Sequence, residues 1–199
     1  MASHLVNSLL LIGALSATVV YAQKNPPAWP LHIERQGALA TLWIVGIVSM
    51  LLLSFTGGIA AMGNTIFPAE SLADGIRADF DPGSHPLIRL RALHPLIAVT
   101  VGVYLFVSLA FAWNIKPVAA AKRLAQGLLG VYILQMLIGV VNLAFLAPIP
   151  LQLLHLGVAV ASFALLSALG VSLLGGAAAA RERTPQAAEP AVGANLEKI

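Results

Sequence analysis

An all-α fold, in which five helices cross a membrane as a polytopic bundle, is what this sequence predicts. Of the 199 residues, 59% are hydrophobic and 10% are charged, whereas soluble domains carry about 25% charged residues. Five apolar stretches are each long enough to cross a ~30 Å hydrocarbon core, which takes about 20 helical residues. They must be helices, because an isolated strand cannot satisfy its backbone in lipid. The spans run roughly over Leu5–Ala22, Ala38–Met62, Leu93–Asn114, Leu124–Leu146 and Leu153–Gly175.

Composition excludes several classes of protein. The chain has no cysteine, so disulfides and thiolate metal sites are excluded. Its basic residues are spread over the loops, which does not suit a nucleic-acid partner. No Asp, Glu, Lys or Arg falls inside a predicted span. Ion pumps and proton-coupled transporters need buried charge, so the sequence argues against both.

The orientation of the spans follows from the distribution of Lys and Arg. Three basic residues, Arg77, Arg89 and Arg91, lie on the side of loop 63–92. The opposite side carries eight, so the positive-inside rule predicts an outside N-terminus and a cytoplasmic C-terminus. These eight are Lys24, Arg35, Lys116, Lys122, Arg123, Arg181, Arg183 and Lys198.

The connecting segments differ in character. Segment 23–37 contains three prolines and is predicted to be an irregular cytoplasmic linker, and the Ala-, Glu- and Pro-rich tail 177–199 is predicted to be disordered. Loop 63–92 has about 30 residues, which is too long for a plain turn, and such loops are often functional. We expect its end, Leu87–Leu93, to be a helical lead-in to the third span.

A faint internal repeat links the first and last spans. His4-Leu5 precedes Leu15-Ser16-Ala17 by the same spacing with which His155-Leu156 precedes Leu166-Ser167-Ala168. Parallel repeats are common in membrane folds. The repeat predicts a four-helix bundle over 38–176, preceded at 1–22 by the last helix of an incomplete N-terminal bundle. Chance identity in apolar sequence of low diversity is the alternative.

Three histidines, His4, His94 and His155, each begin a span that enters the membrane from the outer side. A histidine at the edge of the hydrocarbon is costly and usually functional. The spans of His94 and His155 are parallel, so both imidazoles should lie at one depth. That arrangement is what a six-coordinate haem iron requires, with each iron–nitrogen bond about 2.0 Å long. The alternative is that these histidines only meet water or lipid headgroups.

Arginines and other polar groups near the paired histidines suggest further contacts. Arg89 and Arg91 stand just outside His94, where a guanidinium could pair with a haem propionate or with lipid phosphate. His85 reads as a loop residue, and His32 falls on the opposite side. For several other residues we predict a role in helix packing rather than in the site: Gly57, Gly58, Gly63, Gln135 and Asn142. The tryptophans Trp29, Trp43 and Trp113 suggest an aromatic belt.

Several segments together resemble the haem A synthase family. The resemblance covers about residues 3–175, and its histidine placements are more specific than its glycines. The opening from His4 resembles the fourth helix of that family's first half. The remaining segments resemble the family's second half: Thr56–Pro68, Phe80–His85, Ile88–Pro95, Gly139–Asn142 followed by Pro148, and Leu153–Leu156.

The resemblance implies an eight-helix protein of two four-helix bundles. In that family the second half holds haem B between two histidines, which His94 and His155 resemble. The first half oxidises a methyl group of haem O to a formyl group, giving haem A for cytochrome oxidase, and His4 resembles a histidine of that catalytic site. The implied location is the bacterial cytoplasmic membrane, where membrane lipid is the expected partner of the spans.

Counterparts of the family's first three helices are missing from this chain. We therefore expect a truncated chain, or a split gene with a partner chain that supplies them. Haem O synthase is a further candidate partner, and homo-oligomerisation is left open. Two other functions remain: a bis-histidine b-type cytochrome that only passes electrons, and a haem-free membrane assembly subunit.

Overall fold

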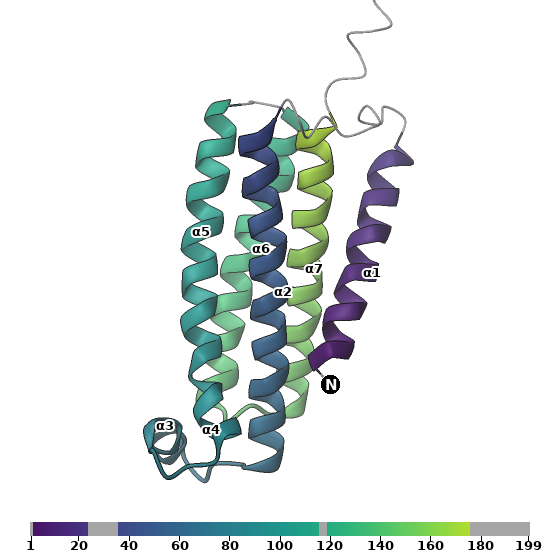
Figure 1. Cartoon of the computed structure of the whole chain (residues 1–199). Helices are drawn as coiled ribbons and strands as arrows, with labels where there is room; N and C mark the ends of the chain where they lie inside the picture. The colour runs from purple at the N-terminus through teal and green to yellow at the C-terminus, as the bar shows by residue number, and fades with distance from the viewer. Residues whose placement is uncertain (1, 24–35, 116–118, 176–199) are drawn as a thin grey trace, which may run out of the picture.

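The computed structural model describes residues 2–23, 36–115 and 119–175. Within these ranges the regular structure is entirely helical, which confirms the all-α prediction (Figure 1). The helices are α1 (Ala2–Tyr21), α2 (Gly37–Ile66), α3 (Leu72–Phe80), α4 (Pro86–Arg91), α5 (Leu93–Ile115), α6 (Ala119–Ala144) and α7 (Ile149–Leu174).

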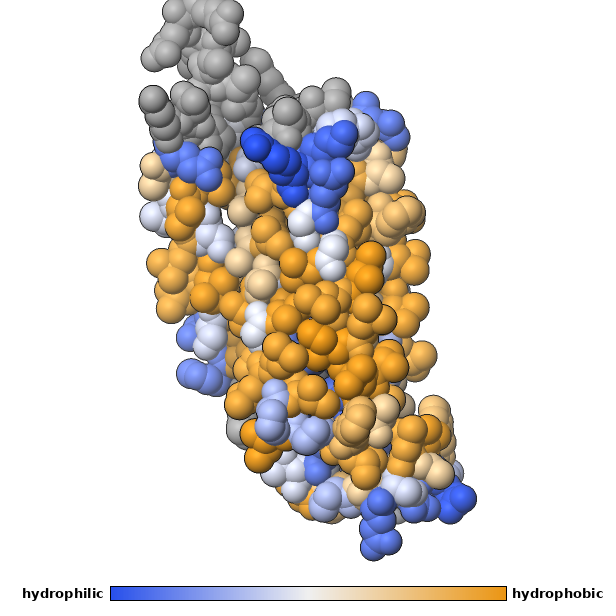
Figure 2. Space-filling model, turned by 180° about the vertical axis from the view of Figure 1, so that it is seen from behind, coloured by the Kyte–Doolittle hydropathy of each residue, from blue (hydrophilic) through white to orange (hydrophobic). Residues whose placement is uncertain are grey.

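Five segments are long and apolar enough to cross a membrane: α1, α2, α4 continued by α5, α6, and α7. Figure 2 shows apolar surface over most of the height of the bundle, with hydrophilic residues gathered towards its two ends. The chain is therefore an integral membrane protein. Some helices extend past the predicted spans, because a helix can continue beyond its apolar stretch: α2 reaches Ile66 and α6 already begins at Ala119.

Helices α2, α5, α6 and α7 form a bundle, and α1 lies at its edge against α7 and α2 (Figure 1). α1, α5 and α7 begin at the same end of the bundle, whereas α2 and α6 run the other way. α6 packs closely along α7, and α5 packs along α2. The assignment of α1 to an earlier, incomplete bundle stays a prediction. Most of the predicted linker 23–37 and all of the tail 177–199 fall outside the described residues.

Hydrogen bonds from side chains to backbone carbonyls join neighbouring helices. The Tyr104 hydroxyl on α5 donates to the carbonyl of Leu42 on α2 at 2.6 Å. The Tyr132 hydroxyl on α6 donates to the carbonyl of Ala98 on α5 at 2.7 Å. Inside a membrane no water competes for these groups, so each bond holds two spans in register.

Trp43 fastens α2 to α7. Its indole Nε1 donates to the Leu166 carbonyl at 3.2 Å. The interpretation of Trp43 as one more boundary aromatic was therefore incomplete, since its ring reaches into the helix packing. Trp113 does lie near the end of its span, with the Lys122 ammonium 5.2 Å from its ring centroid. Trp29 is outside the described residues.

The indole of Trp43 fits only because residue 170 is a glycine. A Cβ added at Gly170 would collide with the indole of Trp43, closest to its Nε1. No real side chain tolerates such an approach, so the indole would have to leave its place. Gly170 thus has a packing role that neither its position nor its neighbours in the sequence reveal.

The turn between α6 and α7 is tight and left-handed. Leu146 and Ala147 have φ values of 59° and 56°, a region that residues other than glycine rarely adopt. Two hydrogen bonds hold it: the Ala147 amide donates to the Asn142 carbonyl at 2.7 Å, and the Gln152 side chain donates to the Ala147 carbonyl. Pro148 then caps α7. The turn fixes where α7 begins relative to α6.

Loop 63–92 folds into two short helices. α4 confirms the predicted helical lead-in, because it runs over Pro86–Arg91 and passes through Ala92 into α5. α3 was not predicted, although its start carries a sequence signal. The Ser71 side chain accepts from the Asp74 amide at 3.2 Å, and the Asp74 carboxylate accepts from the Ser71 hydroxyl at 2.5 Å. This reciprocal arrangement resembles a capping box.

Arg91 ties the two short helices to the end of α2. Its guanidinium lies 2.8 Å from the Asp79 carboxylate of α3. It also donates to the side chain of Asn64 at 3.0 Å and to the Phe67 carbonyl at 3.2 Å. The Arg91 side chain is 9% exposed and that of Asp79 is 17% exposed. A backbone at Gly63 without a Cβ leaves room for the Arg91 stem.

Gly170→Ala should lower the stability of the bundle by about 1–3 kcal/mol, the range typical of overpacked sites. The reason is that the new methyl group displaces the Trp43 indole. Gly130→Ala is the matched control, because a Cβ there meets nothing within 4 Å. Thermal unfolding in detergent measures both. A Gly170 variant as stable as the control would show that the indole has another place to go.

Arg91→Ala should be much more damaging than Arg77→Ala. Removing one partner of a buried ion pair costs about 3–5 kcal/mol, whereas an exposed pair contributes roughly 0–1 kcal/mol. The Arg77–Asp74 pair, at 3.4 Å with side chains 80% and 54% exposed, is the exposed comparison. Limited proteolysis between residues 68 and 85 measures the release of α3 and α4. Equal cleavage of the two variants would contradict a fastening role for Arg91.

Candidate functional site

His94 and His155 lie close together at one end of the bundle. His94 is near the start of α5 and His155 is near the start of α7. Their ring centroids are 6.3 Å apart, with the ring planes 82° from parallel. Because both helices begin at the same end (Figure 1), residues far apart in the sequence reach the same depth. The structure therefore brings this predicted pair together.

Each ring lies against a glycine of a neighbouring helix. A Cβ at Gly57 of α2 would be 2.9 Å from Cε1 of His94, and one at Gly139 of α6 would be 3.1 Å from Cε1 of His155. Any larger residue at either position would push the imidazole away. The sequence had indicated that a flat group or a helix approaches Gly57, and the flat group is the His94 ring itself. Gly139 was named only as part of a segment that resembles the family, and no contact with His155 was predicted for it.

The hydrogen bonds of Thr56 define which ring nitrogen of His94 carries the proton. The Thr56 hydroxyl donates to the Leu53 carbonyl at 2.8 Å, so its one hydrogen is used. Its oxygen lies 3.4 Å from His94 Nδ1, and it can only accept there. Nδ1 therefore carries the proton in this pairing, which leaves the Nε2 lone pair of His94 available to another group.

His155 has a polar partner on α6. Its Nε2 lies 3.0 Å from the side-chain nitrogen of Gln135, and Gln135 is 8% exposed. Because an amide nitrogen can only donate, Nε2 accepts and the proton of His155 resides on Nδ1. The sequence favoured helix packing for Gln135, and its bond to His155 joins α6 to α7.

Three buried polar atoms of α6 and α7 lack a partner among the described residues. They are Nδ1 of His155, Oε1 of Gln135 and Oδ1 of Asn142, all buried. An unpaired polar atom in an apolar surround is costly, by roughly 1–3 kcal/mol in proteins. The unpaired atoms of His155 and Gln135, two side chains in direct contact, are a feature that a bound polar or metallic group would explain.

The donor set limits which metal could bind. Within the described ranges, no group of three or more His, Cys, Asp or Glu side chains gathers to hold an ion. A site made only of protein ligands usually needs four for zinc and more for calcium. Two imidazoles suit a metal that brings its own equatorial ligands, as a porphyrin iron does.

The remaining histidines lie elsewhere. His4 on α1 is exposed, and its imidazole makes no hydrogen bond to a described residue. His85 caps α4: its Nδ1 accepts from the Leu87 amide at 3.2 Å, and its ring packs on Phe67 with centroids 4.9 Å apart. That agrees with its interpretation as a loop residue. His32 lies outside the described residues.

The two predicted arginines have different surroundings. Arg91 bonds to Asp79, Asn64 and Phe67 and so holds the outer loop together; that it also contacts a cofactor carboxylate stays a prediction. Arg89 is exposed and has no ion-pair partner among the described residues. Sequence position alone made the two arginines look equivalent, because Asp79 and Asn64 are distant in the chain.

Comparison with known proteins agrees with this architecture. A family model described as cytochrome oxidase assembly protein matches residues 1–168. Two curated proteins named protoheme IX farnesyltransferase, from two strains of Thermus thermophilus, are each 37% identical over 171 residues. The match covers 86% of this chain and 28% of theirs, and that name does not describe the predicted oxidation. No solved structure matches.

The family match extends over most of the chain and includes both of the closely placed histidines. It also covers all five spans up to the final turns of α7. The chain therefore belongs to the haem A synthase family of cytochrome oxidase assembly proteins.

Proposed function

We propose that this chain is the haem B-binding part of a haem A synthase. His94 and His155 would hold the haem iron through their imidazole nitrogens. The observation that carries the proposal is the 6.3 Å separation of their ring centroids. The chain spans 28% of the length of the curated relatives that it matches, so the activity of a whole enzyme is part of the proposal.

The spacing fits a shared iron. An imidazole nitrogen binds iron at about 2.0 Å, and the ring centroid lies about 1.1 Å further out, so two axial rings have centroids roughly 6 Å apart. The observed 6.3 Å matches that value. The near-perpendicular ring planes fit as well, because each imidazole can rotate about its own bond to the metal.

The two rings differ in readiness for a metal. Nε2 of His94 is free once Nδ1 bonds to Thr56. Nε2 of His155 is held by the Gln135 amide, which would have to release that nitrogen for iron. The unpaired oxygen of Gln135 is then an acceptor near His155. Ligand imidazoles usually donate their second nitrogen to such an acceptor, which fixes their tautomer and orientation.

When bound, the haem would supply one-electron redox chemistry. The residues of this chain position it: Gly57 and Gly139 set the two imidazoles, and Thr56 holds the proton of His94. Arg89 is the candidate partner for a propionate, because it is exposed just outside His94 and carries no ion pair among the described residues. The apolar spans exclude water from the centre.

We further propose that the whole enzyme oxidises a methyl group of haem O to formyl, giving haem A; this four-electron oxidation would need an external oxidant as electron acceptor, and the haem held by His94 and His155 would supply one-electron redox chemistry. His4 would face that substrate. Since His4 is exposed on an edge helix, its site would be completed by further helices, from a longer chain or from a partner. Haem O synthase is a second candidate partner, because it would deliver the substrate.

Electron transfer alone is the second candidate function. It is favoured by the presence of one closely placed histidine pair within the described residues. A b-type cytochrome needs that pair and no substrate site.

The double variant His94→Ala and His155→Ala should lose the low-spin b-type absorption spectrum of the purified protein. Without axial imidazoles the iron has no strong-field ligands from this chain. His85→Ala and His4→Ala are matched controls and should keep the spectrum, since neither residue lies at the pair. The measurement combines visible spectroscopy with haem quantification by pyridine haemochrome. Retention of the spectrum in the double variant, or its absence from the unaltered protein, would refute the proposed cofactor site.

Haem A should accumulate when the full-length gene is expressed with haem O supplied, and mass spectrometry of extracted haem detects it. His4→Ala should abolish haem A while leaving the b-type spectrum intact, because it would act only at the substrate. A normal b-type spectrum without any haem A in the unaltered protein would identify an electron carrier instead. Absence of both signals would identify a haem-free assembly subunit.

A further inference from the structure

The short helix α3 carries an apolar face that nothing in the described chain covers. Leu72, Ile76 and Phe80 are spaced four apart, which places them along one side of the helix. They are 38%, 47% and 72% exposed. Large apolar side chains at such exposure on a single face usually mark a surface that meets a partner or a membrane.

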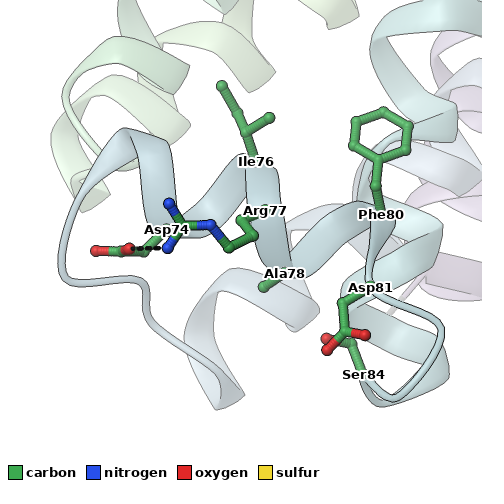
Figure 3. A pocket seen from close by; sticks show the side chains of 7 residues that line it. All are labelled: Asp74, Ile76, Arg77, Ala78, Phe80, Asp81 and Ser84. Atoms are coloured by element: carbon green, nitrogen blue, oxygen red, sulfur yellow. Dashed lines mark hydrogen bonds and ion pairs between the residues drawn. The ribbon is translucent and has the colours of Figure 1, made fainter.

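The exposed charged residues of α3, Asp74 and Arg77, lie beside this face rather than on it. Figure 3 shows Ile76 and Phe80 pointing the same way, whereas Asp81 and Ser84 point away from them. Asp74 pairs with Arg77 at 3.4 Å, and both side chains are well exposed. These residues border a shallow open pocket. α3 is therefore amphipathic, with a water-suited side and an apolar side.

α3 is held at a fixed place at the end of the bundle. Asp79 joins it to Arg91 at the end of α4, and α4 leads directly into the third span. Among the described elements α3 packs chiefly on α4 (Figure 1). The helix cannot turn its apolar side onto the bundle without breaking this buried ion pair.

The apolar face continues towards the lipid-facing surface of the spans. Exposed apolar residues follow along the chain from α4 into α5: Leu90, Leu93 and Leu96. Ile66, at the end of α2, is exposed as well. Figure 2 shows apolar surface extending down to this end of the molecule. The lipid that surrounds the spans is thus the nearest apolar medium to α3.

We propose that α3 lies in the membrane interface, with Leu72, Ile76 and Phe80 inserted at the boundary between headgroups and acyl chains. Interfacial helices bury their apolar side roughly 5–10 Å into that boundary and keep their charges in water. The exposed Asp74–Arg77 pair suits the water side. A helix enclosed by protein on both sides would not leave that pair in solvent. The inference does not depend on the haem.

Site-directed spin labelling tests this placement. The chain has no cysteine, so Ile76→Cys and Phe80→Cys each give one labelling site. Arg77→Cys is the matched control on the polar side. Val99→Cys, at an exposed position of α5, is the reference for a side chain in lipid. The full chain is placed in vesicles of phosphatidylcholine and phosphatidylglycerol, and collision of the nitroxide with oxygen and with a water-soluble nickel chelate is measured.

The ratio of oxygen to nickel collisions should be several-fold higher at positions 76 and 80 than at 77, and should approach the value at 99. Ratios at 76 and 80 equal to that at 77 would place the face in water and overturn the proposal. Low collision with both reagents would mean that protein covers the face, which overturns it equally. Spectra that broaden by dipolar coupling and sharpen on dilution with unlabelled protein would identify a second copy as that cover.

Discussion

The bilayer offers no water to a polar group inside it, and this constraint shapes most of the structure. Tyr104, Tyr132 and Trp43 each bring a polar atom into the bundle, and each atom finds a backbone carbonyl on another helix. The same rule makes the exceptions informative. Unpaired buried atoms of Gln135 and His155 lie at the histidine pair, where the two side chains are hydrogen-bonded to each other. A bound polar or metallic group at this place would explain why the chain breaks the rule there.

Glycine acts at several places where a ring meets a helix in the described part of the chain. Gly57 and Gly139 receive the imidazoles of His94 and His155, and Gly170 receives the indole of Trp43. In each case the missing methyl group lets a planar side chain approach the helix backbone directly. Ridge-and-groove packing of larger residues would hold the helices further apart. In this bundle, aromatic residues join neighbouring helices, and glycines leave the room that planar side chains need.

The spans and the histidine pair were predictable because their signals are local or periodic. A 20-residue apolar stretch predicts a span by itself. A histidine at its edge can be recognised in the sequence without knowing its partner. α3 was missed because its nine residues are neither apolar nor long, and only the spacing of Ser71 and Asp74 marked its start. The role of Arg91 could not be read from the sequence, because Asp79 and Asn64 become its neighbours only after the loop folds. The fit of Trp43 to Gly170 likewise depends on how α2 packs against α7.

The left-handed turn at Leu146 and Ala147 has a consequence for how this bundle can vary. An α-helix advances about 100° per residue. Inserting or deleting one residue between α6 and α7 would therefore rotate α7 by that angle if its packing followed the shift. His155 would then face away from α5, while the apolar character of the span would be unchanged. The length of this connection is thus constrained by the direction of one imidazole, although the turn itself touches neither histidine ring.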